Sequence, residues 1–282
     1  MSPRRWIGLA VIVGASLGAA PAASANTAQS SNWAGYAVHR SGVQFKKVTG
    51  TWTQPSATCT PGRATYSAVW VGIGGFDVHS PALEQIGTES DCTASGRAVS
   101  SAWYELVPAA SRAVRLTVKP GDRMRAGVTV NGNAVTLTLT DLTRHRSFSK
   151  RLHPAVVDTT SAEWILEAPS VCSNAWSCRT LPLADFGSTG FTAAGATSTS
   201  GRRGTIDDRA WTTTRISLAA TGRTFIADSS ASSEAAVASS LSARGSAFTV
   251  TYRGGATAAP LSPVHPAFVA GDRLVRANLT SR

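Results

Sequence analysis

Residues 161–168 read SAEWILEA, and their side chains alternate between two kinds. Neighbouring side chains of a strand point to opposite faces, so Ala162, Trp164 and Leu166 form an apolar face that belongs in a core. The other face carries Glu163 and Glu167. Four residues along a strand span about 13 Å, too far for two carboxylates to act on one bond. If one of these carboxylates does chemistry, its partner therefore comes from elsewhere in the chain.

Short β-rich segments separated by turn residues continue on both sides of this stretch. They lie at 35–38, 47–53, 66–71, 114–118, 135–140 and 248–252. Residues 119–122 and 131–133 are turn signals between them. Many short strands at this spacing predict an all-β fold, an antiparallel two-sheet β-sandwich. The exception is SSEAAVASSL at 232–241, which is expected to be a short capped helix or a small-residue loop.

The first 25 residues resemble a secretory signal. Arg4 and Arg5 precede a short apolar run, and Ala23-Ser24-Ala25 is a small-residue cleavage site. We therefore expect a signal peptide over 1–25, one folded domain over 26–253 and a loosely ordered tail over 254–282. The mature protein is expected to be secreted and not bound to a membrane.

The chain is basic, with a net charge of +11. Removing Arg4 and Arg5 leaves 25 basic and 16 acidic residues, a net charge of +9. The basic residues are scattered, with no block longer than two, so we interpret them as a soluble positive surface and expect no nucleic-acid partner. No signal for assembly is present, and a monomer is expected.

The four cysteines are Cys59, Cys92, Cys172 and Cys178. An even number in an exported chain predicts two disulfides, and three pairings are open. Zinc sites use closely spaced cysteine or histidine pairs, which this chain lacks, so no metal site is expected.

Several catalytic classes find no support in the sequence. No G-x-S-x-G elbow is present, no histidine lies in a β-rich segment that faces a core, and Gly72-Ile73-Gly74-Gly75 is best explained as a turn. Polar residues inside apolar strands remain, and they are Gln85, Glu105, Glu163 and Glu167. A carboxylate among apolar neighbours has a raised pKa and can serve as general base and then as general acid.

Five motifs together resemble the glutamic peptidases, the eqolisin family or peptidase family G1. They are SNWAGY at 31–36, WVGI at 70–73, LEQIG at 83–87, AWYE at 102–105 and AEWILE at 162–167, in the order and at the spacing of that family. The resemblance covers roughly residues 30–252. It implies a bent β-sandwich with a concave cleft, a protein or peptide substrate, and no cofactor or metal.

The resemblance also assigns roles. It implies that Gln85 and Glu167 form the catalytic pair, and that Trp70, Trp103 and Glu105 shape the substrate site. Glu167 would activate a water and Gln85 would stabilise the oxyanion, which implies an acidic working pH.

The chain departs from fungal members of the family at three positions. It has Gly74, Ser101 and Leu106 where they have aspartate, aspartate and an aromatic residue, and no propeptide is evident. The resemblance therefore does not extend to the pH optimum or to subsite preferences.

Two other functions fit the same pattern. One is a carbohydrate-binding or glycoside-hydrolase-like sandwich that uses Glu105 and Glu167. Its carboxyls would lie about 5–5.5 Å apart in a retaining enzyme and about 6.5–9.5 Å apart in an inverting one. The other is an inactive binding protein of the same fold.

Overall fold

The computed structural model describes residues 26–174, 177–219, 234–254 and 262–263, which form strands and connecting loops. The strands are β1 (Asn26–Ser30), β2 (Trp33–His39), β3 (Phe45–Thr53), β4 (Ala68–Gly74), β5 (Leu83–Cys92), β6 (Ala98–Val107), β7 (Arg112–Ala113), β8 (Arg123–Asn131), β9 (Ala134–Asp141), β10 (Arg146–Leu152), β11 (Ser161–Glu167), β12 (Ser170–Asn174), β13 (Ser177–Thr180), β14 (Ser188–Ser198), β15 (Arg203–Gly204), β16 (Thr212–Ala219), β17 (Glu234–Ala238), β18 (Phe248–Tyr252) and β19 (Ser262–Pro263). Within these ranges no helix has the length and apolar character needed to cross a membrane.

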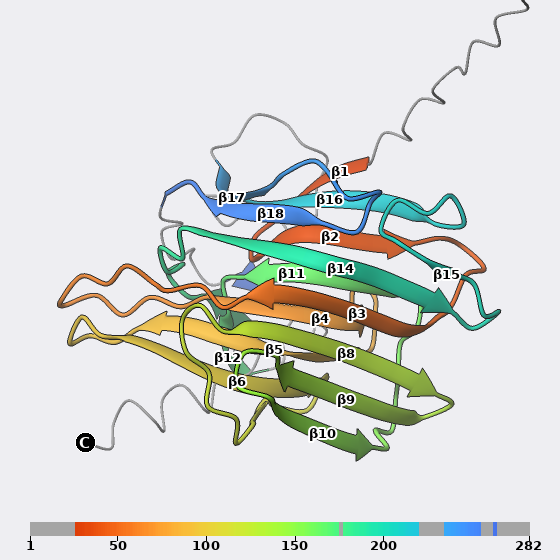
Figure 1. Cartoon of the computed structure of the whole chain (residues 1–282), viewed down its shortest axis with the longest axis horizontal. Helices are drawn as coiled ribbons and strands as arrows, with labels where there is room; N and C mark the ends of the chain where they lie inside the picture. Colours follow the sequence, from red (N-terminus) through yellow and green to blue (C-terminus); the bar gives the residue numbers. More distant parts are fainter. Residues whose placement is uncertain (1–25, 175–176, 220–233, 255–261, 264–282) are drawn as a thin grey trace, which may run out of the picture.

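Most strands belong to one long hydrogen-bonded sheet that folds over on itself into two layers (Figure 1). The first layer runs β10-β9-β8-β3-β14-β18, and the second runs β17-β16-β2-β11-β4-β5-β6-β7. The pairing of β17 with β18 joins the layers. All pairs along this path are antiparallel, whereas β1 adds to β16 in parallel. The predicted antiparallel β-sandwich is confirmed, with β12, β13 and β19 as a small separate sheet.

The core lies between the two layers and contains the apolar face of β11. Trp164 and Leu166 are fully buried there with Trp52 from β3. The Trp164 indole donates to the Thr49 carbonyl at 2.8 Å, and the Trp52 indole donates to the Thr88 hydroxyl at 3.0 Å. Each bond crosses from one layer to the other. Burying a large apolar side chain contributes about 1.5–3 kcal/mol, so these tryptophans also hold the layers together.

The predicted strand at 114–118 is wrong. β7 ends at Ala113, and the chain then crosses to β8 in the other layer. Val114 and Val118 are nevertheless buried, at 7% and 6% exposure. The alternation of apolar and polar residues at 114–118 thus arises because one side of the crossing segment is buried. It does not indicate strand pairing.

The predicted helix at 232–241 is wrong where the structure describes it, and the alternative of a loop holds only for 239–241. Glu234–Ala238 is strand β17, paired with β16 and β18. Ala235, Ala236 and Ala238 are buried. Pairing on both sides outweighs the helix propensity of alanine, which is a weak local preference.

Cys59 and Cys92 form a disulfide. Cys172 and Cys178 lie opposite each other in the β12–β13 ladder, as their backbone register shows, but their side chains are outside the description. Their pairing stays a prediction. The expected signal peptide, and all of the expected tail except Gly254, Ser262 and Pro263, lie outside the described residues.

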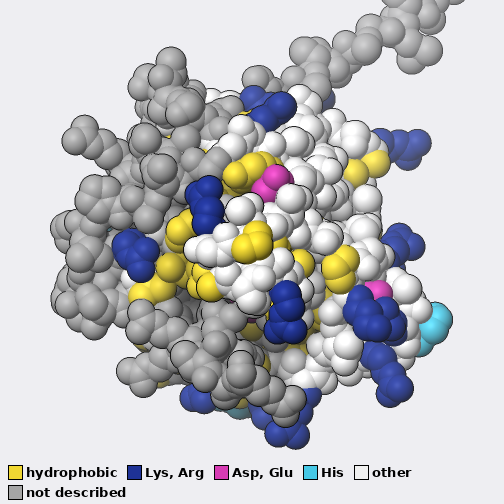
Figure 2. All heavy atoms as spheres, turned by 90° about the vertical axis from the view of Figure 1, so that its left-hand side faces the viewer, with side chains coloured by type: hydrophobic (Ala, Val, Ile, Leu, Met, Phe, Trp, Pro, Cys, Tyr) yellow, Lys and Arg dark blue, Asp and Glu magenta, His cyan; other side chains and the backbone are white. Residues whose placement is uncertain are grey.

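The surface is basic without a dominant cluster on the face that Figure 2 shows. Lys and Arg side chains are spread around that face, and acidic side chains are sparse. The view agrees with the scattered positive charge expected from the sequence.

Candidate active site

The outer face of the second layer carries the residues singled out from the sequence. In the ladder, Glu163 of β11 lies opposite Gly72 of β4, Gly72 opposite Gln85 of β5, and Gln85 opposite Glu105 of β6. Residues directly opposite in antiparallel strands share a face, so these side chains form one row. The Gln85 amide nitrogen donates to a Glu105 carboxylate oxygen at 2.7 Å. The structure therefore joins Gln85 to Glu105.

Glu167 lies on the same face, two rows away. Its Oε1 accepts a hydrogen bond from the Asn32 amide at 3.0 Å, and its Oε2 accepts one from the Trp70 indole at 2.7 Å. Trp33 packs edge-on against Trp70, with ring centroids 5.0 Å apart. Glu167 is 2% exposed. Its carboxyl is thus held in one place by two side-chain donors.

Gln85 and Glu167 are separated by two strand spacings and four residues along the strands. These steps correspond to about 10 Å across and about 13 Å along the sheet at the Cα atoms. In the part of the chain that the structure describes, no hydrogen bond joins the two side chains, and the Gln85 amide is turned toward β6.

Trp70 occupies the region between them. Its indole nitrogen reaches Glu167, and its ring edge lies over Gly72, where an added Cβ would be 2.9 Å from Cζ3 and 3.4 Å from the Gln85 Cβ. The indole therefore extends from the acid toward the amide.

Burial raises the pKa of Glu167 to about 7. Hydrogen bonds from Trp70, Asn32 and Trp33 oppose this rise, and the charge of Glu89 adds to it. A carboxyl with this pKa exchanges its proton readily near neutral pH, as a group that must act as both base and acid requires.

Glu163 has a different environment. It is fully buried, and neither carboxyl oxygen has a hydrogen-bond partner within 3.5 Å among the described residues. Burial, with the charges of Asp158 and Glu84, holds its pKa well above the usual value, although its interaction with the Ser161 hydroxyl lowers it. Glu163 thus lacks the amide and indole donors that hold Glu167.

Trp103 lies on the same face, between the rows of Gln85 and Glu167, opposite Gly87. It is 5% exposed, and its indole nitrogen has no partner among the described residues. Trp70 and Trp103 thus lie on the same face as Gln85 and Glu167, and both are buried.

Glu105 and Glu167 do not form the carboxylate pair of a glycosidase. Three strand spacings, about 14 Å, and four residues along the strands, about 13 Å, separate them. At this separation the two carboxyl groups cannot come within about 9.5 Å of each other, the largest spacing that a glycosidase pair uses. In the described residues, no group of His, Cys, Asp and Glu has an arrangement that could hold a metal ion.

The sequence analysis did not identify Glu89 and Asn32 as site residues. Glu89 lies four residues after Gln85 on the same face and in the row of Glu167, separated from it by Ala68. The alternation of side chains along β5 already places Glu89 on the same face as Gln85, so the sequence could have indicated Glu89. Asn32 lies just before β2, and only the fold brings it to Glu167.

An acid and an amide lie on one face of an all-β sandwich, as the resemblance to the glutamic peptidases implied. The sequence leads to the same class, because residues 31–241 match the Peptidase A4 family. This match covers most of the chain, so the chain belongs to that family, which is the eqolisin family that the motifs predicted.

Comparisons with named relatives and solved structures support the same family assignment. Aspergillopepsin-2 of Aspergillus niger is 31% identical over 197 residues, 61% of this chain and 66% of the relative, so the chain spans about two thirds of its length. Scytalido-glutamic peptidase, solved with a transition state analog inhibitor, superposes with a TM-score of 0.64 at 25% identity, covering 79% of this chain and 98% of the other. Aspergilloglutamic peptidase from Aspergillus niger gives a TM-score of 0.53 at 27% identity, covering 67% and 99%.

Proposed function

We propose that this chain hydrolyses peptide bonds with Glu167 as the general base and acid and Gln85 as the stabiliser of the oxyanion. The observation that carries the proposal is the environment of Glu167. Its carboxyl is buried, is held by Trp70 and Asn32, and has a pKa of about 7. Glu163, the other acid of β11, has no such donors.

The chemistry uses one proton. Glu167 as carboxylate takes a proton from a water, and the water oxygen bonds to the peptide carbonyl carbon. The carbonyl oxygen gains negative charge and accepts a hydrogen bond from the Gln85 amide. Protonated Glu167 then gives its proton to the leaving nitrogen as the C–N bond breaks.

Glu105 positions the amide in this scheme. A glutamine amide carries two N–H donors, and Glu105 accepts one of them at 2.7 Å. The orientation of Gln85 is thereby fixed, and the second N–H is left for the substrate. The ladder places the Cα atoms of Gln85 and Glu167 about 16 Å apart, so both side chains act on one peptide bond only if the substrate carbonyl binds between them, over the Trp70 indole.

Secretion, the working pH and the assembly state belong to the same proposal. We infer that the protein is exported, which the Cys59–Cys92 disulfide supports, since disulfides persist in oxidising compartments. A Glu167 pKa of about 7 favours a working range that extends to near-neutral pH, less acidic than the resemblance alone implied. Monomeric state remains a prediction.

The test is hydrolysis of an unfolded protein substrate by the purified mature chain between pH 2 and 8. Glu167→Gln and Gln85→Ala are expected to lose roughly 10²–10³ in rate or more. Glu163→Gln is the matched control, because it changes the other buried acid of β11, which the proposed mechanism does not use, and it should keep most of the activity. Undiminished cleavage by Glu167→Gln would refute the assignment, and cleavage of polysaccharide without protein would refute the class.

A further inference from the structure

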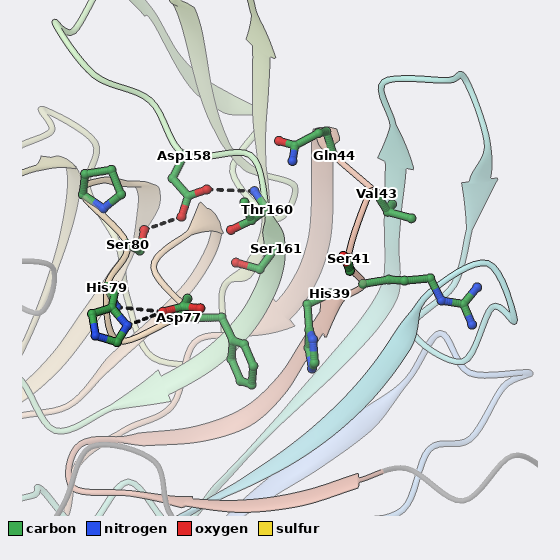
Figure 3. Close-up of a pocket in the computed structure, with 14 residues that line it drawn as sticks. His39, Ser41, Val43, Gln44, Asp77, His79, Ser80, Asp158, Thr160 and Ser161 are labelled. Atoms are coloured by element: carbon green, nitrogen blue, oxygen red, sulfur yellow. Dashed lines mark hydrogen bonds and ion pairs between the residues drawn. The ribbon is translucent and has the colours of Figure 1, made fainter.

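A pocket of about 740 Å³ lies at one end of the same face (Figure 3). Its edge is the next row of the ladder, where Ser161 of β11 lies opposite His39 of β2. This row is two residues, about 7 Å, from the row of Gln85 and Glu163. Ser161 also lies two strands, about 10 Å, across the sheet from Gln85, so only a long side chain of a peptide bound over Gln85 reaches the pocket. Its volume is in the range of pockets that hold small ligands.

One wall of the pocket is aromatic. Phe76 stacks on His39 with ring centroids 4.5 Å apart and an angle of 20° between the planes. His39 is fixed from behind by a hydrogen bond between its Nε2 and the Thr214 hydroxyl at 2.9 Å. The flat surface of such rings favours planar or cationic groups.

The other side of the pocket carries hydrogen-bond acceptors. Asp158 Oδ1 accepts from the Thr160 N–H at 2.9 Å, while its Oδ2 accepts from the Ser80 hydroxyl and from the Gly75 N–H. A carboxylate has about four acceptor positions, so Asp158 is fixed but retains capacity. The Asp77 side chain is 66% exposed, and among the described residues its ion pair is with His79, which is 84% exposed, so this contact has small energy.

Ser161 adds a buried hydroxyl to this edge of the pocket. It is 1% exposed, and among the described residues no partner meets hydrogen-bond geometry within 3.5 Å of its hydroxyl, although its interaction with the nearby Glu163 carboxyl lowers the pKa of that group. Figure 3 shows this hydroxyl directed toward the side of the pocket formed by Ser80 and Asp77.

The charge of the pocket is opposite to that of the chain. Arg40 also lines the pocket, and its guanidinium donates to the carbonyls of Arg209 and Ala210 at 3.2 and 2.9 Å. Asp77 and Asp158 are thus not neutralised by it, although the chain has a net charge of +11.

We propose that this pocket is a subsite that accepts an arginine side chain of the peptide substrate. A guanidinium is planar, stacks on aromatic rings and carries five N–H donors. It matches the Phe76 ring on one side and the acceptors Asp77, Asp158 and Ser161 on the other. Lysine offers a point charge and no planar surface, and binds less well. The inference rests on the proposed peptidase function.

The test compares peptides that carry either arginine or citrulline, its uncharged analogue of the same shape, at successive positions. The wild type is expected to cleave the arginine peptide about tenfold better in kcat/KM at one position. The double variant Asp77→Asn/Ser161→Ala should bring this ratio close to one and leave the citrulline rate unchanged. Asp158 is left intact because it holds Ser80, Thr160 and Gly75.

The matched control is Asp185→Asn, which removes the same charge near the segment that precedes β4, away from the pocket at the other end of that strand. It should keep the wild-type ratio. A ratio of one at every position in the wild type, or a ratio that the double variant leaves unchanged, overturns the proposal.

A binding measurement separates failure of the subsite from failure of the proposed function. Fluorescence anisotropy with labelled arginine and citrulline peptides is measured on Glu167→Gln, with and without Asp77→Asn/Ser161→Ala. If the wild type cleaves no peptide, the proposed function fails. The anisotropy measurement then still shows whether the pocket binds an arginine side chain. About tenfold tighter binding of the arginine peptide, lost in the pocket variant, supports the subsite. Equal binding of both peptides overturns it.

Discussion

Trp70 connects the two halves of the candidate site at the scale of single residues. Its indole nitrogen donates to Glu167, and its ring extends over Gly72 toward Gln85. The hydrogen bond stabilises the ionised form of Glu167 and so opposes the effect of burial on the pKa of that carboxyl. One side chain thus influences the charge state of the acid and fills the space between the acid and the amide.

Replacing Trp70 with phenylalanine removes this donor and leaves an aromatic ring. The pKa of Glu167 should rise from about 7, and the acidic limb of the kcat/KM profile should move to higher pH by about one unit. Trp103→Phe is the matched control, because that indole nitrogen has no partner among the described residues. If the acidic limb of the kcat/KM profile lies at the same pH in Trp70→Phe and Trp103→Phe, the assignment of Glu167 as the base is contradicted.

Glu105 is expected to act through the orientation of Gln85. In Glu105→Gln the amide of Gln85 loses its charged acceptor and rotates more freely. We expect kcat to fall about tenfold with KM changed by less than about twofold, since only the transition-state contact is weakened. Steady-state kinetics on one peptide give both values. Glu163→Gln, from the same row, should match the wild type, and equal losses in the two variants would argue against a positioning role.

The site residues could be predicted from the sequence only in part. The motifs identified Gln85, Glu167, Trp70, Trp103 and Glu105, and period-two alternation placed each on a strand face. The bond from Asn32 to Glu167 spans 135 residues of sequence, so only the pairing of β2 with β11 produces it. The difference between Glu163 and Glu167 likewise depends on donors from other strands.

At the scale of elements, glycines in β4 and β5 keep the face open beside Trp70. A Cβ at Gly87 would lie 2.2 Å from the Val69 carbonyl oxygen and 2.6 Å from the Trp70 Cβ. Backbone atoms cannot give way at such distances. These glycines therefore let Trp70 lie close to β5, where a larger residue would displace it.

Gly87→Ala is expected to destabilise the fold by about 1–3 kcal/mol and to lower activity by moving Trp70. Gly190→Ala on β14 is the control, because its added Cβ would meet nothing closer than 3.6 Å. Urea unfolding measures both variants against the wild type. The close approach of β5 to Trp70 is refuted if Gly87→Ala unfolds at the same midpoint as Gly190→Ala.

The errors in predicting elements have a common physical cause. Residues 114–118 alternate like a strand but cross between layers, and alanine-rich 234–238 pairs as a strand between β16 and β18. Alternation reports which side chains are buried, and propensity reports local preference. Neither contains the pairing partner, which only the assembled sandwich supplies.

At the scale of the whole molecule, buried acids make stability depend on pH. Burial raises the pKa of Glu84 to about 9 and that of Glu167 to about 7, from 4.5. Between pH 4.5 and these values the unfolded chain has lost protons that the folded chain keeps. Stability is therefore full below about pH 4.5 and falls as pH rises through this window, by up to about 1.4 kcal/mol per pH unit for each group.

Glu84→Gln should reduce this loss, because the amide carries no charge at any pH in the window. Urea midpoints at pH 4, 6 and 8 should fall with pH in the wild type and fall less steeply in the variant. An identical slope in the two proteins would show that Glu84 ionises as freely in the folded state as in the unfolded one.

The position of β1 determines how removal of N-terminal residues by another protease would affect activity. β1 pairs with β16 at the margin of the second layer, and its first two residues are exposed. It leads directly into Ser30, whose hydroxyl accepts the N–H groups of Asn32 and Trp33. Stepwise trimming by an aminopeptidase past Ser30 would remove the hydroxyl that holds both Asn32 and Trp33 beside Glu167. A trimmed preparation is therefore expected to lose turnover.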